Sequence, residues 1–167
     1  MRRILTLLIV ALAAMLPGCH SIELKDNIVT GWVYIPFTTQ GDWEVYGVSG
    51  ALDSRRFIMS RNVPAGYAYQ QQCGTGLGGV LLVTTVYGDY RAYDLACPIE
   101  RSASVLVAIN PDTNMAVCPK CKSVYDVFQL QGGAGYPVEG QALAEGYALT
   151  PYRVLFGADN RYALISR

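Results

Sequence analysis

Histidine is almost absent from this chain of 167 residues, in which His20 is the only one. Hydrolysis by a serine or cysteine nucleophile with a histidine base is therefore excluded in the segment that follows it. Charged residues are also few, at 16% of the sequence, and the formal net charge is zero. Nucleic-acid binding usually needs a stripe of basic residues. The sequence thus predicts no hydrolase of that type and no nucleic-acid partner.

A long apolar run is missing as well. The longest one covers residues 4–16, and a helix of that length would extend for only about 20 Å. The hydrocarbon core of a bilayer is about 30 Å thick, so this run is too short to span it. It follows Met1-Arg2-Arg3 and ends before Pro17-Gly18-Cys19, which is the plan of a secretory signal.

Leu16, Gly18 and Cys19 resemble the lipobox of bacterial lipoproteins. The resemblance implies that residues 1–18 are a signal peptide and that Cys19 carries the lipid that anchors the chain to a membrane. The expected location is the cell envelope of a Gram-negative-type bacterium, with the outer membrane favoured over the inner one. Partners in that compartment would be an envelope protein or a redox protein.

The remainder of the chain is predicted to be all-β. Residues 19–40 are expected to form a lipidated tether with a first strand that stops at Pro36, and residues 41–167 to form one β domain of small stacked antiparallel sheets. Only residues 141–147 show a weak helical period. Short β-branched and aromatic runs, separated by glycine and proline, indicate strands near residues 79–87, 90–95, 104–109, 115–118, 124–128, 152–156 and 161–165.

The segment Gly74-Thr75-Gly76-Leu77-Gly78-Gly79 satisfies the dinucleotide-binding pattern G-x-G-x-x-G. In nucleotide-binding proteins this pattern opens a helix whose N-terminus holds the pyrophosphate. Here the following residues, 80–87, are β-branched and aromatic and favour a strand. We therefore interpret these glycines as a tight loop.

Four cysteines follow the expected anchor: Cys73, Cys97, Cys118 and Cys121. Proline comes directly after two of them, at Pro98 and Pro119. Because proline fixes φ and lacks an N–H group, it stiffens each loop just behind the sulfur atom. Two such Cys-Pro loops, separated by about one hairpin of chain, are more specific than scattered cysteines.

These loops resemble the two cluster-binding boxes of the Rieske iron–sulfur family. Cys97 and Cys118 stand at the two cysteine positions, and Ser123 and Tyr125 match the end of the second box. In that family these hydroxyls hydrogen-bond the sulfurs. A glycine- and proline-rich segment resembles the loop that covers the cluster, with Gly133, Gly135, Pro137 and Gly140 in the matching region. The resemblance implies a Rieske-like fold over most of the β domain.

The chain departs from the family at the ligands. Ile99 and Cys121 stand where the two histidines belong, and Lys122 replaces the glycine after the second one. Because one iron of a Rieske centre needs two imidazoles, a Cys₂His₂ cluster cannot form within one chain.

Three interpretations of the sulfurs remain open. Disulfides are the usual state of exported cysteines, and the family fold would bring Cys97 close to Cys118 or Cys121. A zinc ion could instead use the C-x-x-C pair of Cys118 and Cys121 with Cys97 and a fourth ligand. The third interpretation is an all-cysteine iron–sulfur cluster, for which Cys73 completes the four thiolates.

The leading prediction is a non-enzymatic structural or binding module without a cofactor, whose former cluster site is held by cysteines. The alternative is an electron carrier with an iron–sulfur cluster, or a structural zinc site. Paired catalytic carboxylates find no support, because acids near glycine- or proline-marked loops are expected on the surface. These acids are Asp94, Glu100, Asp126 and Glu139.

Overall fold

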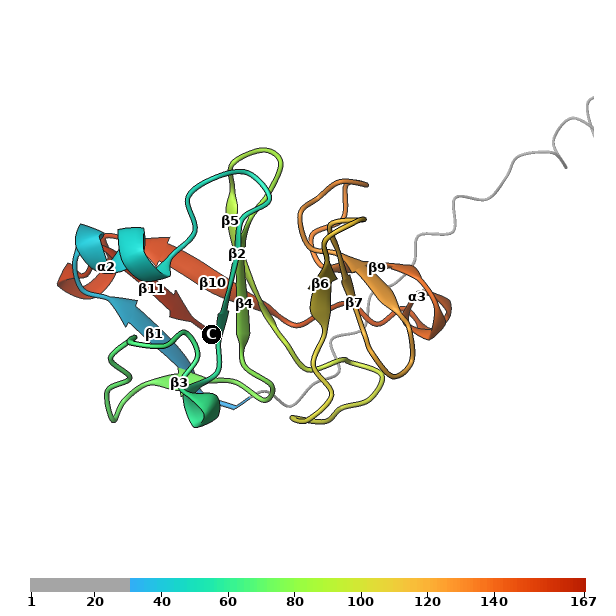
Figure 1. Ribbon diagram of the computed structural model, residues 1–167, viewed down its shortest axis with the longest axis horizontal. Helices are drawn as coiled ribbons and strands as arrows, with labels where there is room; N and C mark the ends of the chain where they lie inside the picture. The colour runs from blue at the N-terminus through green and yellow to red at the C-terminus, as the bar shows by residue number, and fades with distance from the viewer. Residues whose placement is uncertain (1–30) are drawn as a thin grey trace, which may run out of the picture.

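The structure is a computed structural model that describes residues 31–167 (Figure 1). The expected signal peptide, Cys19 and most of the tether lie outside the described residues. The helices are α2 (Gln40–Tyr46) and α3 (Gln141–Glu145). The strands are β1 (Val33–Phe37), β2 (Ser54–Phe57), β3 (Gly74–Thr75), β4 (Val80–Thr84), β5 (Tyr90–Asp94), β6 (Ala108–Asn110), β7 (Met115–Val117), β8 (Val124–Asp126), β9 (Tyr136–Glu139), β10 (Pro151–Phe156) and β11 (Ala163–Ser166).

The strands form two antiparallel sheets, which confirms the expected all-β class. Seven strands follow the order β2-β4-β5-β10-β11-β1-β3 and curl into a nearly closed, barrel-like sheet. Four strands follow the order β6-β7-β8-β9. Figure 1 shows the two sheets side by side, with α2 at the far end of the larger sheet and α3 beside β9. Among residues 31–167 no helix is long and apolar enough to cross a membrane.

Strand β4 separates two hydrophobic cores. Side chains alternate across a strand, so Val80 and Leu82 pack into one core while Leu81 and Val83 pack into the other. All five residues of β4 are buried, which explains why its sequence is continuously apolar rather than alternating. The core on one side is the aromatic interior of the larger sheet. The core on the other side reaches into the four-stranded sheet and includes Cys97 and Cys118.

The first strand differs from the prediction, because β1 continues through Pro36 to Phe37. It lies within the larger sheet between β11 and β3, so it belongs to the folded domain rather than to a tether. Proline is accepted there because β3 pairs only with Val33 and Tyr34. At Pro36 the chain pairs on one side alone, opposite Leu164.

Helix α2 and strands β2, β3 and β9 were not expected, and β3 begins in the segment interpreted as a glycine loop. Helix α2 begins with a capping box, in which Thr39 accepts from the Asp42 amide and the Asp42 carboxylate accepts from the Thr39 amide. Strand β2 was missed because its two arginines hide a strand that has only one fully buried residue, Phe57. Strand β9 occupies the glycine- and proline-rich segment and pairs with β8.

Candidate metal centre

The two Cys-Pro loops bring three sulfur atoms together. The Sγ atoms of Cys97, Cys118 and Cys121 all lie within 4.8 Å of one another, and those of Cys97 and Cys121 are 3.6 Å apart. Cys97 and Cys118 are fully buried, whereas Cys121 is half-buried. Soft thiolates at this spacing form a donor set for a soft metal ion.

Both loops adopt the same turn. The amide of Arg101 donates to the carbonyl of Cys97 (2.9 Å), and the amide of Lys122 donates to the carbonyl of Cys118 (3.2 Å). Arg101 and Lys122 both have left-handed backbones, with φ of 49° and 60°. Each loop therefore runs cysteine, proline, two residues and a left-handed basic residue. The two cysteines thus begin equivalent turns.

An ion pair joins the two loops directly. Glu100 belongs to the first loop and Lys120 to the second, and the Lys120 ammonium group contacts the Glu100 carboxylate. The side chain of Glu100 is only 11% exposed, while that of Lys120 is 68% exposed. The hydrogen bond and the charge of the Glu100 carboxylate raise the pKa of Lys120.

Hydroxyl groups contact two of the three sulfurs. The Tyr125 hydroxyl lies 3.6 Å from Cys97 Sγ, and Ser123 Oγ lies 3.3 Å from Cys121 Sγ. Ser123 Oγ also accepts a hydrogen bond from the amide of Ala142 at the start of α3 (3.0 Å). Tyr125 and Ser123 are both fully buried, so their positions are fixed by packing.

The environment differs between two of the sulfurs. Burial raises the pKa of the Cys97 thiol to about 12, against the opposing effect of the Glu100 amide and the Tyr125 hydroxyl. Burial acts in the same sense on Cys121, but hydrogen bonds with the side chain and the amide of Ser123, and with Cys118 and Cys97, lower its pKa overall. Cys121 is thus more readily ionised than Cys97.

The segment expected to cover the site lies against the second loop at its end. A Cβ atom added at Gly140 would come within 2.9 Å of Ser123 Cα, so only glycine fits there. At Gly135, where φ is +75°, an added Cβ would meet the Tyr93 ring at 2.5 Å. Pro137 is paired with Tyr125 in the sheet, and Gly133 lies against Tyr136.

Cys73 does not join the other three cysteines. It immediately precedes β3, which pairs with β1 at one end of the larger sheet, and its Sγ accepts a hydrogen bond from the Gln70 amide (3.3 Å). Burial raises the pKa of its thiol. Within residues 31–167, a set of four cysteine ligands is therefore not assembled.

The expected disulfide of Cys97 with Cys118 or Cys121 is not formed. All cysteines of residues 31–167 are free thiols, and the 3.6 Å contact is far longer than the 2.05 Å of a disulfide bond. The resemblance placed the two loops together, and the structure does bring them together. The sulfurs meet as hydrogen-bonded thiols rather than as a covalent pair.

Two acids that were expected on the surface are fully buried. Asp94 accepts from the amides of Leu77, Gly78 and Ala96 at 2.8, 3.0 and 2.7 Å, and from the Tyr152 hydroxyl at 2.5 Å. The glycine loop thus binds a carboxylate of its own chain instead of a nucleotide phosphate. The sequence signal for this role is the position of Asp94 at the end of β5, directly before the first Cys-Pro loop.

The second buried acid organises the end of β8. Asp126 accepts from the amides of Leu130 and Gln131 at 2.9 and 2.6 Å. A buried carboxylate needs such partners because it would otherwise lose its hydration without compensation. Asp94 and Asp126 therefore act as internal acceptors that shape loops.

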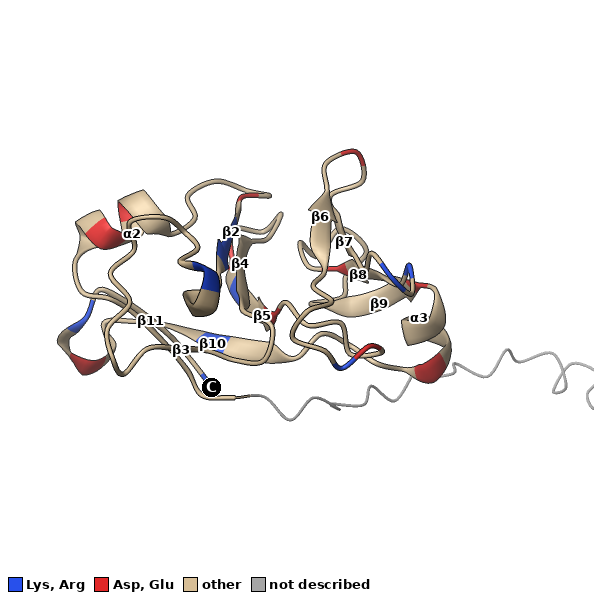
Figure 2. Cartoon of the chain, turned by 60° about the horizontal axis from the view of Figure 1, so that its bottom comes forward, with Lys and Arg blue, Asp and Glu red and all other residues tan. Residues whose placement is uncertain are grey.

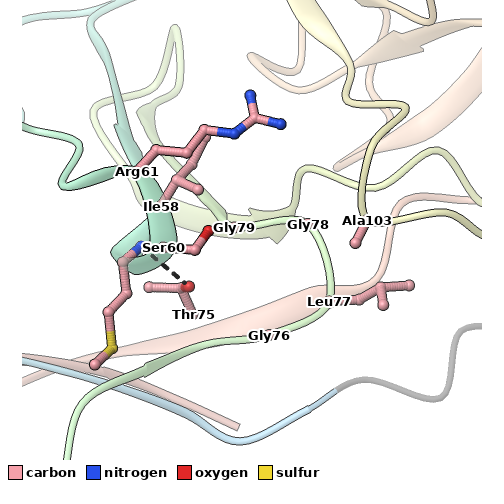
Figure 3. A pocket seen from close by; sticks show the side chains of 10 residues that line it. Ile58, Ser60, Arg61, Thr75, Gly76, Leu77, Gly78, Gly79 and Ala103 are labelled. Atoms are coloured by element: carbon pink, nitrogen blue, oxygen red, sulfur yellow. Dashed lines mark hydrogen bonds between the residues drawn. The ribbon is translucent and has the colours of Figure 1, made fainter. Parts of the chain in front are cut away.

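A cavity of about 410 Å³ lies where the larger sheet fails to close, beside the glycine loop (Figure 3). There the Met59 amide donates to Thr75 Oγ1 across the gap between the β2 and β3 ends of the sheet (3.4 Å). Arg61 contributes to the lining, but its guanidinium extends away from Gly76. Lys and Arg are spread over several elements of the described chain, among them β2 and β10 (Figure 2).

Comparisons of the chain with protein-family models, with curated proteins and with solved structures found no match. The resemblances to bacterial lipoproteins and to the Rieske family therefore stay predictions from the sequence. The geometry of the three cysteines is the strongest guide to function.

Proposed function

We propose that this protein binds a soft metal ion, with zinc as the leading candidate, through the thiolates of Cys97, Cys118 and Cys121. The observation that carries the proposal is the convergence of these three sulfurs within 4.8 Å. Tetrahedral zinc with bonds of 2.3 Å to sulfur separates its sulfur ligands by about 3.8 Å. The 3.6 Å between the Cys97 and Cys121 sulfurs is close to that value.

A structural role fits this site better than a catalytic one. Two of the three sulfurs are fully buried, and the ends of both loops are fixed by backbone hydrogen bonds. The Cys97 amide donates to Val105 (3.1 Å) and the Cys118 amide to Ser123 (2.9 Å). A bound ion would link the two loops and add binding energy to folding. The protein is thus proposed to be a non-enzymatic structural or binding module.

The proposal includes a cellular setting. The lipobox-like residues before Cys19 support export and lipid anchoring in a bacterial envelope, and the paired Cys-Pro boxes support descent from a Rieske-like domain. In that setting the three thiolates occupy the position of the former cluster. A partner in the envelope would then meet the β domain at the membrane surface.

Electron transfer is a second candidate, favoured by the two hydroxyls at the sulfurs. Hydrogen bonds to sulfur raise the reduction potential of an iron–sulfur cluster, and Tyr125 and Ser123 would supply them. Such a cluster needs four protein ligands, however, and Cys73 lies elsewhere. The cluster would therefore need a ligand other than cysteine.

Metal and acid-labile sulfide analysis of the mature chain, purified without oxygen, tests the proposal. We expect about one zinc ion per chain and no sulfide, with the zinc lost in Cys118→Ser and kept in the matched control Cys73→Ser. About two irons and two sulfides per chain would instead establish the electron carrier. If the chain contains no metal and also binds no zinc after its thiols have been reduced, both the zinc site and the electron carrier are overturned.

A further inference from the structure

We infer that Glu100 is the fourth ligand of the metal site, so that three thiolates and one carboxylate surround the ion. This inference rests on the proposed metal-binding function. It concerns the one position that three cysteines leave open, since a tetrahedral structural site has four protein ligands.

The equivalence of the two turns is the first argument. Cys121 is the third residue after Cys118, and Glu100 is the third residue after Cys97. Because both loops share the same carbonyl-to-amide bond and the same left-handed residue, the two positions lie at equivalent points of their turns. Cys121 uses that point to place its sulfur 3.6 Å from the Cys97 sulfur of the opposite loop. Glu100 therefore occupies the position of the first loop that corresponds to Cys121 in the second.

The surroundings of Glu100 are the second argument. Its amide donates to the Cys97 sulfur, and its side chain is 11% exposed although glutamate is usually solvated. Its carboxylate contacts Lys120, which directly precedes Cys121. The side chain thus reaches from the first loop to the second. No Glu100 oxygen lies within 4.8 Å of all three sulfurs, so ligation needs the carboxylate to leave the ammonium group of Lys120 and turn to the ion, while Lys120 stays protonated.

Charge is the third argument. Three thiolates and a carboxylate around a divalent cation carry a net charge of about −2, which is costly to hold near a core without compensation. Three basic residues lie on the two loops, at Arg101, Lys120 and Lys122. Arg101 lies over the Tyr147 ring (5.7 Å), and Lys122 donates to the Pro119 carbonyl (2.6 Å). These contacts hold two cations on the loops after Lys120 has released the carboxylate.

Zinc competition with a chromophoric chelator, together with cobalt(II) absorption spectra, tests the inference on the full mature chain. We expect Glu100→Gln to weaken zinc binding about 10- to 100-fold, the range seen when groups that support a metal site are lost. Its cobalt(II) spectrum should shift when imidazole is added, because the fourth position is then open. Glu100→Cys should give the stronger charge-transfer bands of four thiolates. The matched control Glu139→Gln, at an exposed position of β9, should bind zinc like the wild type.

The variant Lys120→Met distinguishes two roles of Glu100, as a ligand of the ion or only as the ion-pair partner of Lys120. If Glu100 is a ligand, this variant binds zinc as tightly as the wild type or more tightly, because the carboxylate has no competitor. Equal weakening by Lys120→Met and Glu100→Gln would mean that the pair only clamps the loops, and unchanged binding by Glu100→Gln would place water in the fourth position. In both results the three thiolates still hold zinc, whereas a wild type without metal overturns the inference together with the proposed function.

Discussion

The core inside the larger sheet is rich in aromatic rings, whereas the core that reaches into the four-stranded sheet combines aliphatic side chains with cysteines and is bordered by buried polar groups. In the first, Phe37 packs against Trp43, Phe57 and Tyr67 with ring centroids 4.9, 5.7 and 6.0 Å apart. In the second, the strands have only three or four residues, and β6 has no buried residue. The buried carboxylate of Asp126 and the hydroxyl of Ser123 fix its loops.

This difference shows that one small domain can place its main stabilising core and its candidate metal site on opposite sides of one strand. On one side of β4, close-packed rings and aliphatic side chains form a core that needs no ligand. On the other side, short strands leave the cysteine loops dependent on specific hydrogen bonds. A bound ion would add to those hydrogen bonds without disturbing the aromatic core.

Removal of a central aromatic ring should have the largest effect on stability and should test whether the aromatic core is independent of the metal site. Phe37 is fully buried, so Phe37→Ala should lower the free energy of unfolding by about 3–5 kcal/mol through the lost contacts and the cavity. Urea denaturation of the metal-free chain measures this, with Tyr87→Ala, at 75% exposure, as a control that changes little. Zinc affinity of the folded variant should stay unchanged. If Phe37→Ala weakened zinc binding by as much free energy as it cost in unfolding, the aromatic core and the metal site would not be independent.

Asp94 connects the two regions, because it holds the glycine loop and the start of the first Cys-Pro loop. Asp94→Asn leaves at least one buried donor without an acceptor and should cost about 2–3 kcal/mol. Hydrogen exchange at Leu77, Gly78 and Ala96 should become faster. The exposed Asp89→Asn serves as the control, and equal protection of the three amides in both variants would disprove the role of Asp94.

Tyr125→Phe tests whether the contact between hydroxyl and sulfur contributes to the core that contains Cys97 and Cys118. Loss of the hydroxyl at Cys97 should destabilise the chain by about 1 kcal/mol and weaken zinc binding up to about 10-fold. Tyr93→Phe is a matched control, because the Tyr93 hydroxyl is buried without a hydrogen-bond partner among the described residues. Denaturation and zinc competition should place the control at or above the stability of the wild type. The reverse order would show that the sulfur contact contributes nothing.

The smallest change in structure is alkylation of a single thiol. Cys121 has a lowered pKa and is half-buried, so its thiolate should appear first as pH rises, and iodoacetamide should modify it before the other cysteines. Burial raises the pKa of Cys97 and of Cys73, which should therefore react later. Peptide mass spectrometry over pH 6 to about 9 follows the order. Equal rates for Cys73 and Cys121 would contradict it.

The sequence predicts the all-β class and several strands because β-branched and aromatic runs in β4, β5, β8 and β10 have no helical period. The resemblance of the two Cys-Pro loops to the Rieske boxes also implies that these loops meet, and the three sulfurs do lie together. It does not reveal that Cys73 stays apart, because this depends on the pairing of β3 with β1. Pairing between distant segments leaves no local pattern.

The burial of polar residues is the second feature that could not be predicted from the sequence. Asp94 and Asp126 stand near loops where acids are commonly solvated, and only the direction of nearby amides makes them internal acceptors. The sequence also does not show that the Glu100 side chain is mostly buried, because its partner Lys120 lies 20 residues away. Helix α2 left a readable signal in Thr39 and Asp42, since their spacing is that of a capping box.

The pairing of β1 with β11 also sets the time at which the chain can fold. Tyr34 lies opposite Ser166, so the larger sheet cannot close until residues 163–166 have left the ribosome. Synthesis at about 5–20 residues per second leaves the earlier strands without this neighbour for several seconds. During that interval β1 lacks its partner β11, so the larger sheet stays incomplete until the end of β11 has been made.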